Sequence, residues 1–186
     1  MVYDVRLIDA IKGRKSIRKF KADPVPEEWV RDVLDAANYA PSAKRGEQWR
    51  FTVLTGEAKD AFLRMFDAEL DRFIEKHGVE EAGSSKNSCR IMGEAPVLVI
   101  VWNSGKHGWL TEEHSVAAAI QNMLLRAYDL GLGSLWIGDV YYAYDAIRRY
   151  FGKDWKLSGA VSLGFPDAEG LSFKRKTVDQ VAEFLR

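Results

Sequence analysis

A short segment near the N-terminus combines residue types that suit the binding of a phosphate group. Two arginines, a lysine and a serine fall within residues 14–18. Guanidinium groups form planar paired hydrogen bonds to phosphate oxygens, while ammonium and hydroxyl groups add charge and a further donor. In an extended chain Ser16, Arg18 and Phe20 would share one face, and Ile17 would occupy the other. The pattern favours an anchored binding segment over a charge run that merely solvates the surface.

Three further segments could contact a flat or charged ligand. Pro41 and Ser42 lie between a predicted helix and a predicted strand. Proline and serine are also common in such loops without any binding role. Gly138 ends a glycine-rich stretch at 131–138, and a residue without a side chain lets the backbone approach a ring closely. Residues 174–176 are Lys-Arg-Lys, which predicts either an added phosphate contact or a frayed basic tail.

The residue types of several common catalytic sites are missing. One cysteine, Cys89, and three scattered histidines predict neither an internal disulfide nor a metal-ligand cluster. The sequence contains no nucleophile elbow, no Walker loop and no dinucleotide-binding glycine fingerprint. If the chain is an enzyme, a bound cofactor must therefore supply its chemistry.

Length and charge narrow the class of protein further. The 186 residues suit a single domain spanning 1–186, and the formal net charge is zero. A balanced charge argues against a general role in binding nucleic acid or a membrane surface. Acidic residues interrupt the N-terminal region where a signal peptide would need an apolar run, so the expected location is the cytoplasm.

Alternating helical and strand patterns predict one α+β domain. Apolar residues with helical spacing indicate helices, and β-branched or continuous apolar runs indicate strands. A stretch rich in Gly and Ser at 77–86 is predicted to be a loop. Helices are expected near 7–13, 26–40, 57–75, 113–130 and 144–151, and strands at 49–54, 96–102, 135–137 and 157–165.

The four segments occur in the same order and with similar spacing as in the FMN-dependent nitroreductase family, which the chain resembles over nearly its whole length. The N-terminal segment resembles the family's phosphate motif, and Trp136-Ile137-Gly138 resembles its flavin-facing turn. The other resembling parts are Ala40-Pro41-Ser42 with Trp49 and Phe51, the helix at 119–125, Gly131-Leu132-Gly133, Leu163-Gly164-Phe165-Pro166 and Lys174-Arg175-Lys176.

The resemblance implies a fold, a cofactor and an assembly. The fold would be a central, mainly antiparallel sheet flanked by helices, in a homodimer with FMN at the subunit interface. Contacts to phosphate, ribityl or the pyrimidine edge would come from Arg14, Lys15, Ser16 and Arg18. Those to the ring would come from Trp136, Ile137 and Gly138, with the Gly138 N–H directed at N5. Further contacts would come from Lys174, Arg175, Asn87 and Arg90, and from Pro41, Ser42 and Ala43 of the partner subunit.

The implied activity is transfer of hydride from NADH or NADPH to FMN, and then to an electron-poor small molecule such as a nitro compound or quinone, in a ping-pong sequence. No side chain of the protein is expected to act as an obligatory nucleophile. Two alternatives remain open: a flavin store or regulator without turnover, and an interaction domain without cofactor. The sequence departs from the family where Arg45, Glu47 and Gln48 replace Asn, Gln and Pro. It is also short for the family.

Overall fold

The central feature of the protein is a four-stranded sheet in which every neighbouring pair of strands is antiparallel. A computed structural model describes residues 6–185. The strands are β1 (Trp49–Leu54), β2 (Val97–Asn103), β3 (Gly133–Ile137) and β4 (Lys156–Gly164), and they lie in the order β1-β2-β4-β3. β2 is buried at every position, which explains its continuous apolar sequence. The predicted strands and the mainly antiparallel sheet are therefore confirmed.

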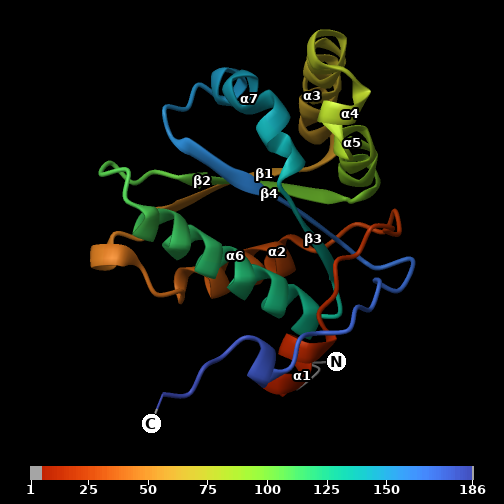
Figure 1. Cartoon of the computed structure of the whole chain (residues 1–186). Coiled ribbons are helices and arrows are strands. Elements are labelled where there is room, and N and C mark those ends of the chain that lie inside the picture. The colour runs from red at the N-terminus through yellow and green to blue at the C-terminus, as the bar shows by residue number, and fades with distance from the viewer. Residues whose placement is uncertain (1–5, 186) are drawn as a thin grey trace.

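Helices cover both faces of the sheet (Figure 1). One face carries α2 (Glu27–Asn38) and α6 (Leu110–Asp129), with α1 (Leu7–Gly13) beside the C-terminal end of α6. The other face carries α3 (Gly56–His77), α4 (Val79–Ala82), α5 (Ser85–Glu94) and α7 (Tyr144–Phe151). Short 3-10 helices lie at η1 (Ala43–Arg45), η2 (Asp139–Ala143) and η3 (Val178–Gln180).

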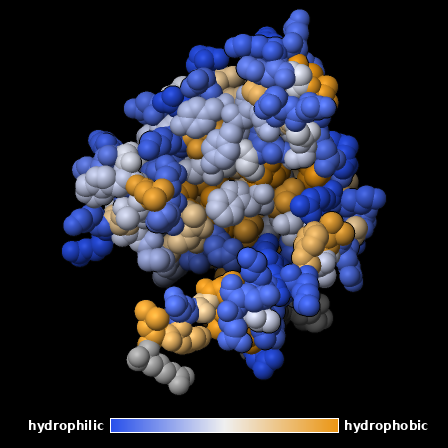
Figure 2. Space-filling view, in the orientation of Figure 1, coloured by the Kyte–Doolittle hydropathy of each residue, from blue (hydrophilic) through white to orange (hydrophobic). Residues whose placement is uncertain are grey.

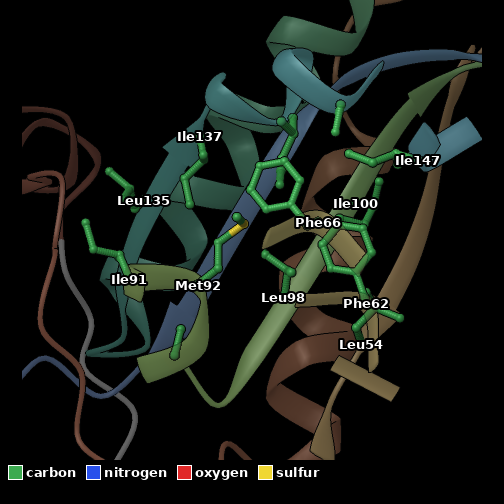
Figure 3. Packing of buried hydrophobic residues seen from close by; sticks show 14 of the residues in the cluster. Leu54, Phe62, Phe66, Ile91, Met92, Leu98, Ile100, Leu135, Ile137 and Ile147 are labelled. Carbon is green, nitrogen blue, oxygen red and sulfur yellow. The ribbon is translucent and has the colours of Figure 1, made fainter. Parts of the chain in front are cut away.

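The sheet separates two hydrophobic cores. On the α3 side, Phe62 and Phe66 pack with Ile100 of β2 and Ile147 of α7, and all four side chains are fully buried (Figure 3). On the other side, the small and branched residues of α2 and α6 pack against the opposite faces of β2 and β4. Burial of apolar surface on both faces stabilises the sheet that positions the candidate site.

The predicted loop at 77–86 is wrong, because α4 lies within it and α5 begins at Ser85. The serines and Gly83 gave this stretch the composition of a loop. In the folded chain, Ser85, Ser88 and Met92 of α5 are buried at helical spacing. Tertiary packing therefore overrides a weak local helix preference. Another difference is that α6 begins at Leu110, before the predicted start.

Hydrophobic side chains remain exposed on α1 and on the C-terminal tail. The space-filling view shows hydrophobic residues on the surface beside the C-terminus (Figure 2). Exposed apolar residues that lie together commonly mark an interaction surface. Those exposed here are Leu7, Ile8 and Ile11 of α1, and Leu171, Phe173, Val178, Val181, Phe184 and Leu185 of the tail.

Candidate functional site

The N-terminal basic segment is fixed between β3 and the chain that leaves β4. The Ile17 N–H donates to the Ser134 carbonyl at 3.0 Å, and Ser16 forms a parallel bridge with Ser134. Four residues later, Phe20 forms an antiparallel bridge with Pro166. The segment is therefore anchored at both ends, as the interleaved apolar residues predicted.

The predicted alternation of faces along this segment is wrong in one respect. Ile17 and Phe20 are both buried, whereas Arg18 and Lys19 are both exposed. The bridges at Ser16 and Phe20 are isolated, so no continuous strand imposes a two-residue period between them. The Arg18 guanidinium donates to the Ser16 carbonyl at 3.3 Å and lies at the surface.

A cavity of about 700 Å³ opens beside the basic segment. Arg14, Lys15 and Lys21 line it together with the turn at 131–134. Among residues 6–185, no carboxylate lies within 4 Å of the charged nitrogens of Arg14 or Lys15. Two cations without a carboxylate partner in this part of the chain can pair with an anionic ligand group.

The C-terminal tail leaves from the same cavity. Gly170 packs on Lys15 so closely that an added Cβ would lie 2.5 Å from the Lys15 Cβ. Lys174 and Arg175 follow within five residues and are exposed, with no side-chain hydrogen bond to the rest of residues 6–185. An extended chain spans up to about 3.5 Å per residue, so this tail has the length to return to the basic segment. In this structure Lys174 and Arg175 do not reach the basic segment whose phosphate site they were predicted to complete.

The second end of the candidate site lies one strand length away, where β3 ends. From Ser134 to Gly138 is four residues, about 13 Å of extended chain. Along this edge strand Trp136 is 41% exposed, whereas Ile137 is buried in the core. Edge strand β3 therefore joins the basic segment to an end where Gly138, which has no side chain, leaves the backbone accessible.

Hydrogen bonds at its N-terminal end hold helix α5 beside the end of β3. The Asp139 carboxylate, just after Gly138, accepts from the Ser84 hydroxyl at 2.8 Å and the Ser88 hydroxyl at 2.6 Å. Ile91 and Met92 of α5 lie beside Leu135 and Ile137 of β3 in one cluster (Figure 3). The exposed face of α5 carries the predicted residues Asn87 and Arg90.

Those two residues bond to their own helix. The Arg90 guanidinium donates to the Asn87 side-chain oxygen at 3.0 Å and pairs with Glu94. Both side chains are exposed, so a ligand can compete for these contacts at low cost. The structure thus brings the basic segment, β3 and α5 to one edge of the sheet.

Lys59 holds the C-terminal end of α5 and was not identified from the sequence. The residue is only 6% exposed, and its Nζ donates to the carbonyls of Gly93 at 2.8 Å and Ala95 at 2.5 Å. Burial lowers the pKa of Lys59, against a smaller opposing effect of the Asp60 carboxylate. A cation at this position also satisfies carbonyls that a helix end leaves without partners.

Replacing Lys59 with methionine is expected to lower the free energy of unfolding by about 1–3 kcal/mol, because two carbonyls at the end of α5 lose their donor. Denaturant titration of the purified variant measures the change. Lys76 provides the control, because it is an exposed lysine in the last turn of α3, the helix that also contains Lys59. Its replacement by methionine should change stability by no more than about 0.5 kcal/mol. Equal losses in the two variants would contradict this role for Lys59.

The segment Pro41-Ser42-Ala43 lies at the opposite end of α6 from the basic segment. The Ala43 N–H donates to the Ser115 hydroxyl at 2.9 Å, near the N-terminal end of α6. Gly13, next to the basic segment, packs against Tyr128 near the other end of α6. Ser115 and Tyr128 are thirteen positions apart along α6, which corresponds to about 20 Å. Within one chain, therefore, the segment is not brought to Arg14; Figure 1 shows α1 and residues 43–45 at opposite ends of α6.

The loop after this segment has an unusual backbone. Lys44, Arg45 and Glu47 have positive φ angles of 55°, 55° and 42°, a region that side-chain-bearing residues seldom occupy. Gln48 is buried, and its side-chain N–H donates to the Ala43 carbonyl at 2.9 Å. A proline at 48, as in the resembled family, could not make this bond. The departures at 45, 47 and 48 thus form one locally closed loop that supports Ala43.

Comparison with known proteins shows which family this chain belongs to. Residues 11–165 match the profile of the nitroreductase family, a range that covers most of the chain. The chain belongs to the nitroreductase family. The match includes the basic segment, residues 41–43, α5 and β3, and ends before the basic tail.

Relatives and solved structures agree with this membership. A protein of Bacillus subtilis (strain 168), YfhC, whose name assigns it to the NAD(P)H nitroreductases, is 30% identical over 177 residues, 92% of this chain and 89% of its own length. A Methanothermobacter thermautotrophicus protein, named for NADH dehydrogenase and NAD(P)H nitroreductase, is 34% identical over 86% of this chain and 77% of its own. The structure of a Bacteroides fragilis nitroreductase with bound FMN is 29% identical, covers 98% of this chain and 99% of its own, and has a TM-score of 0.77.

The nitroreductase fold is thus confirmed, with helices on both faces of a four-stranded antiparallel sheet. Across the part of the chain that the structure describes, no helix combines the length and apolar character needed to cross a membrane. Of the residues that position the site, sequence reasoning missed Lys59, Ser84, Ser88 and Asp139. Their roles depend on contacts between segments far apart in the sequence, and no local motif signals them.

Proposed function

We propose that this protein is an FMN-dependent oxidoreductase that takes hydride from NADH or NADPH and reduces electron-poor small molecules, such as nitro compounds or quinones. The main structural support for this proposal is edge strand β3, which has a cationic segment at its start and an accessible glycine at its end. FMN has a matching polarity, because it carries a phosphate at one end and a flat ring at the other. Family membership and the FMN bound to the Bacteroides fragilis nitroreductase support the choice of cofactor.

At the phosphate end, Arg14 and Lys15 supply cations that have no carboxylate partner among residues 6–185, and Ser16 supplies a hydroxyl. Arg18 lies at the surface of the same segment and can turn from the Ser16 carbonyl to a ligand. In this proposal the tail folds back to add Arg175 and Lys174. Arginine forks and a lysine ammonium together match the charge and geometry of a phosphate.

At the ring end, Gly138 offers its backbone N–H towards N5, and Trp136 and Ile137 supply the adjoining strand. Asn87 and Arg90 on α5 face the pyrimidine edge, where a cation would stabilise negative charge on the ring. Bound FMN would supply the two-electron chemistry. The protein's own residues hold the ring, fix its orientation and shape the space for the donor and the acceptor.

The proposed site needs a second subunit. Pro41, Ser42 and Ala43 lie about 20 Å along α6 from the basic segment of their own chain, so a two-fold partner would supply them to the ring. The exposed apolar residues of α1 and the C-terminal tail support a large interface. We expect the dimer to bury more than about 2,000 Å², as obligate pairs do.

Cofactor release and turnover test the proposal. Denatured protein should release FMN, identified against FMN and FAD standards, and sedimentation should give a dimer. The holoenzyme should oxidise NADH or NADPH when a quinone or nitroaromatic is added, with parallel lines in double-reciprocal plots. FAD as the main species, or a monomer that keeps its flavin, would contradict the proposal. Bound FMN without turnover would instead favour a flavin store or regulator.

A further inference from the structure

A second cavity, of about 420 Å³, lies beside the segment 41–43 and has a distinct chemical character. The residues that line it include Trp109, Lys44 and His114 of α6. Its lining contains hydroxyl, aromatic and cationic groups but no Asp or Glu. The cavity is therefore suited to a flat ligand that carries negative charge.

Trp109 lies at the end of a loop that hydrogen bonds and close packing hold in place. The Gly105 N–H donates to the Asn103 side-chain oxygen at 2.8 Å, and the His107 N–H donates to the Glu112 carboxylate at 3.3 Å. Glu112 is 1% exposed, and a Cβ at Gly105 would lie 2.4 Å from its carboxyl carbon. The loop from β2 to α6 thus packs directly on a buried side chain, in a conformation with no room for a side chain at 105.

This loop carries a stacked aromatic pair, and one member of the pair, Trp109, lines the cavity. The rings of His107 and Trp109 lie 4.3 Å apart with an interplanar angle of 16°, yet Trp109 is 45% exposed. A large aromatic surface held in place while facing solvent can stack on a ligand with little loss of side-chain entropy. Lys44, which also lines the cavity, has a positive φ, a strained backbone state that is common at binding sites.

We infer that this cavity is the acceptor subsite, and that it selects flat aromatic acceptors carrying a carboxylate or a similar anionic group. Trp109 stacks on the acceptor ring and Lys44 pairs with the anionic group. The inference rests on the proposed function, because the cavity borders segment 41–43, which would meet the partner subunit's FMN. It assigns the specificity to residues of the loop that joins β2 to α6 and of the loop after Ala43.

The test compares 4-nitrobenzoate with uncharged 4-nitrobenzamide as acceptors for the holoenzyme. The wild type should have the lower KM for 4-nitrobenzoate. Lys44→Ala should raise that KM by about fivefold, as expected for an exposed ion pair, and leave the KM for the amide within about twofold. Trp109→Ala should raise both values by about fivefold because each acceptor loses the stacking surface. Lys106→Ala, an exposed lysine outside the cavity lining, is the matched control and should change neither KM.

Calorimetric titration with benzoate supplies a readout that does not depend on turnover. The Kd for benzoate should rise in Lys44→Ala and Trp109→Ala but not in Lys106→Ala. Equal KM values for the two acceptors in wild type, or unchanged benzoate binding in both cavity variants, would overturn the inference. Failure of the proposed function has a different signature: no turnover of either acceptor by the wild type. In that case benzoate binding still decides whether the cavity is an anion-selective aromatic site.

Discussion

Arg14→Ala is expected to weaken FMN binding by roughly tenfold to a hundredfold while the protein remains folded. Arg14 lines the cavity beside the basic segment and has no carboxylate within 4 Å among residues 6–185. Loss of a charge-assisted contact to a phosphate costs about 1.5–3 kcal/mol of binding. Fluorescence titration of flavin-free protein with FMN measures the effect, and the variant should lose flavin on dialysis.

Lys19→Ala is the control for this measurement. Lys19 belongs to the same basic segment, but it is exposed and is not part of the cavity lining. Its loss should change FMN affinity by less than about threefold, since exposed charges at a distance act weakly through water. If Arg14→Ala binds FMN as tightly as wild type, Arg14 does not hold the phosphate. Equal, small losses of FMN affinity in both variants would mean that the segment acts only through its overall positive electrostatic potential.

Two defective variants are expected to restore function when they share a dimer. Arg14→Glu places a negative charge beside the proposed phosphate position, and Ala43→Phe places a large ring where segment 41–43 would face the partner subunit's flavin. Each homodimer should lose nearly all bound FMN. With random assortment, about half of the dimers are mixed and each mixed dimer has one intact site, so about a quarter of all sites should recover.

Co-expression with two different affinity tags allows the mixed dimer to be isolated. Bound FMN per dimer and NAD(P)H oxidation should each return to about half of the wild-type value in the purified mixed dimer, because one of its two sites is intact. A site built from one chain would give no recovery, since each subunit would still carry its own defect. Absence of recovery with normal dimer formation would therefore overturn the shared site. Co-expression of Arg14→Glu with both tags controls for effects of the tags.

The sequence alone determined most of the secondary structure, because those signals are local. Strand β1 matches the predicted range 49–54, and helix α7 matches 144–151. The continuous apolar run of β2 predicted a strand buried on both faces, which the structure confirms. Periodicity and β-branched residues report directly on the burial of neighbouring positions, so one segment suffices to interpret them. The order of the motifs along the chain also sufficed to identify the family.

Only the tertiary structure decided how the segments of the candidate site are arranged. The predicted loop at 77–86 contains one helix and the start of another, because buried contacts with α3 and β3 stabilise α5. The hydrogen bonds from Ser84 and Ser88 to Asp139 join residues more than fifty positions apart, and no local pattern encodes them. The separation of Ala43 from Arg14 likewise follows from the length of α6. Local sequence specifies each element, whereas long-range packing and hydrogen bonds specify where the elements meet.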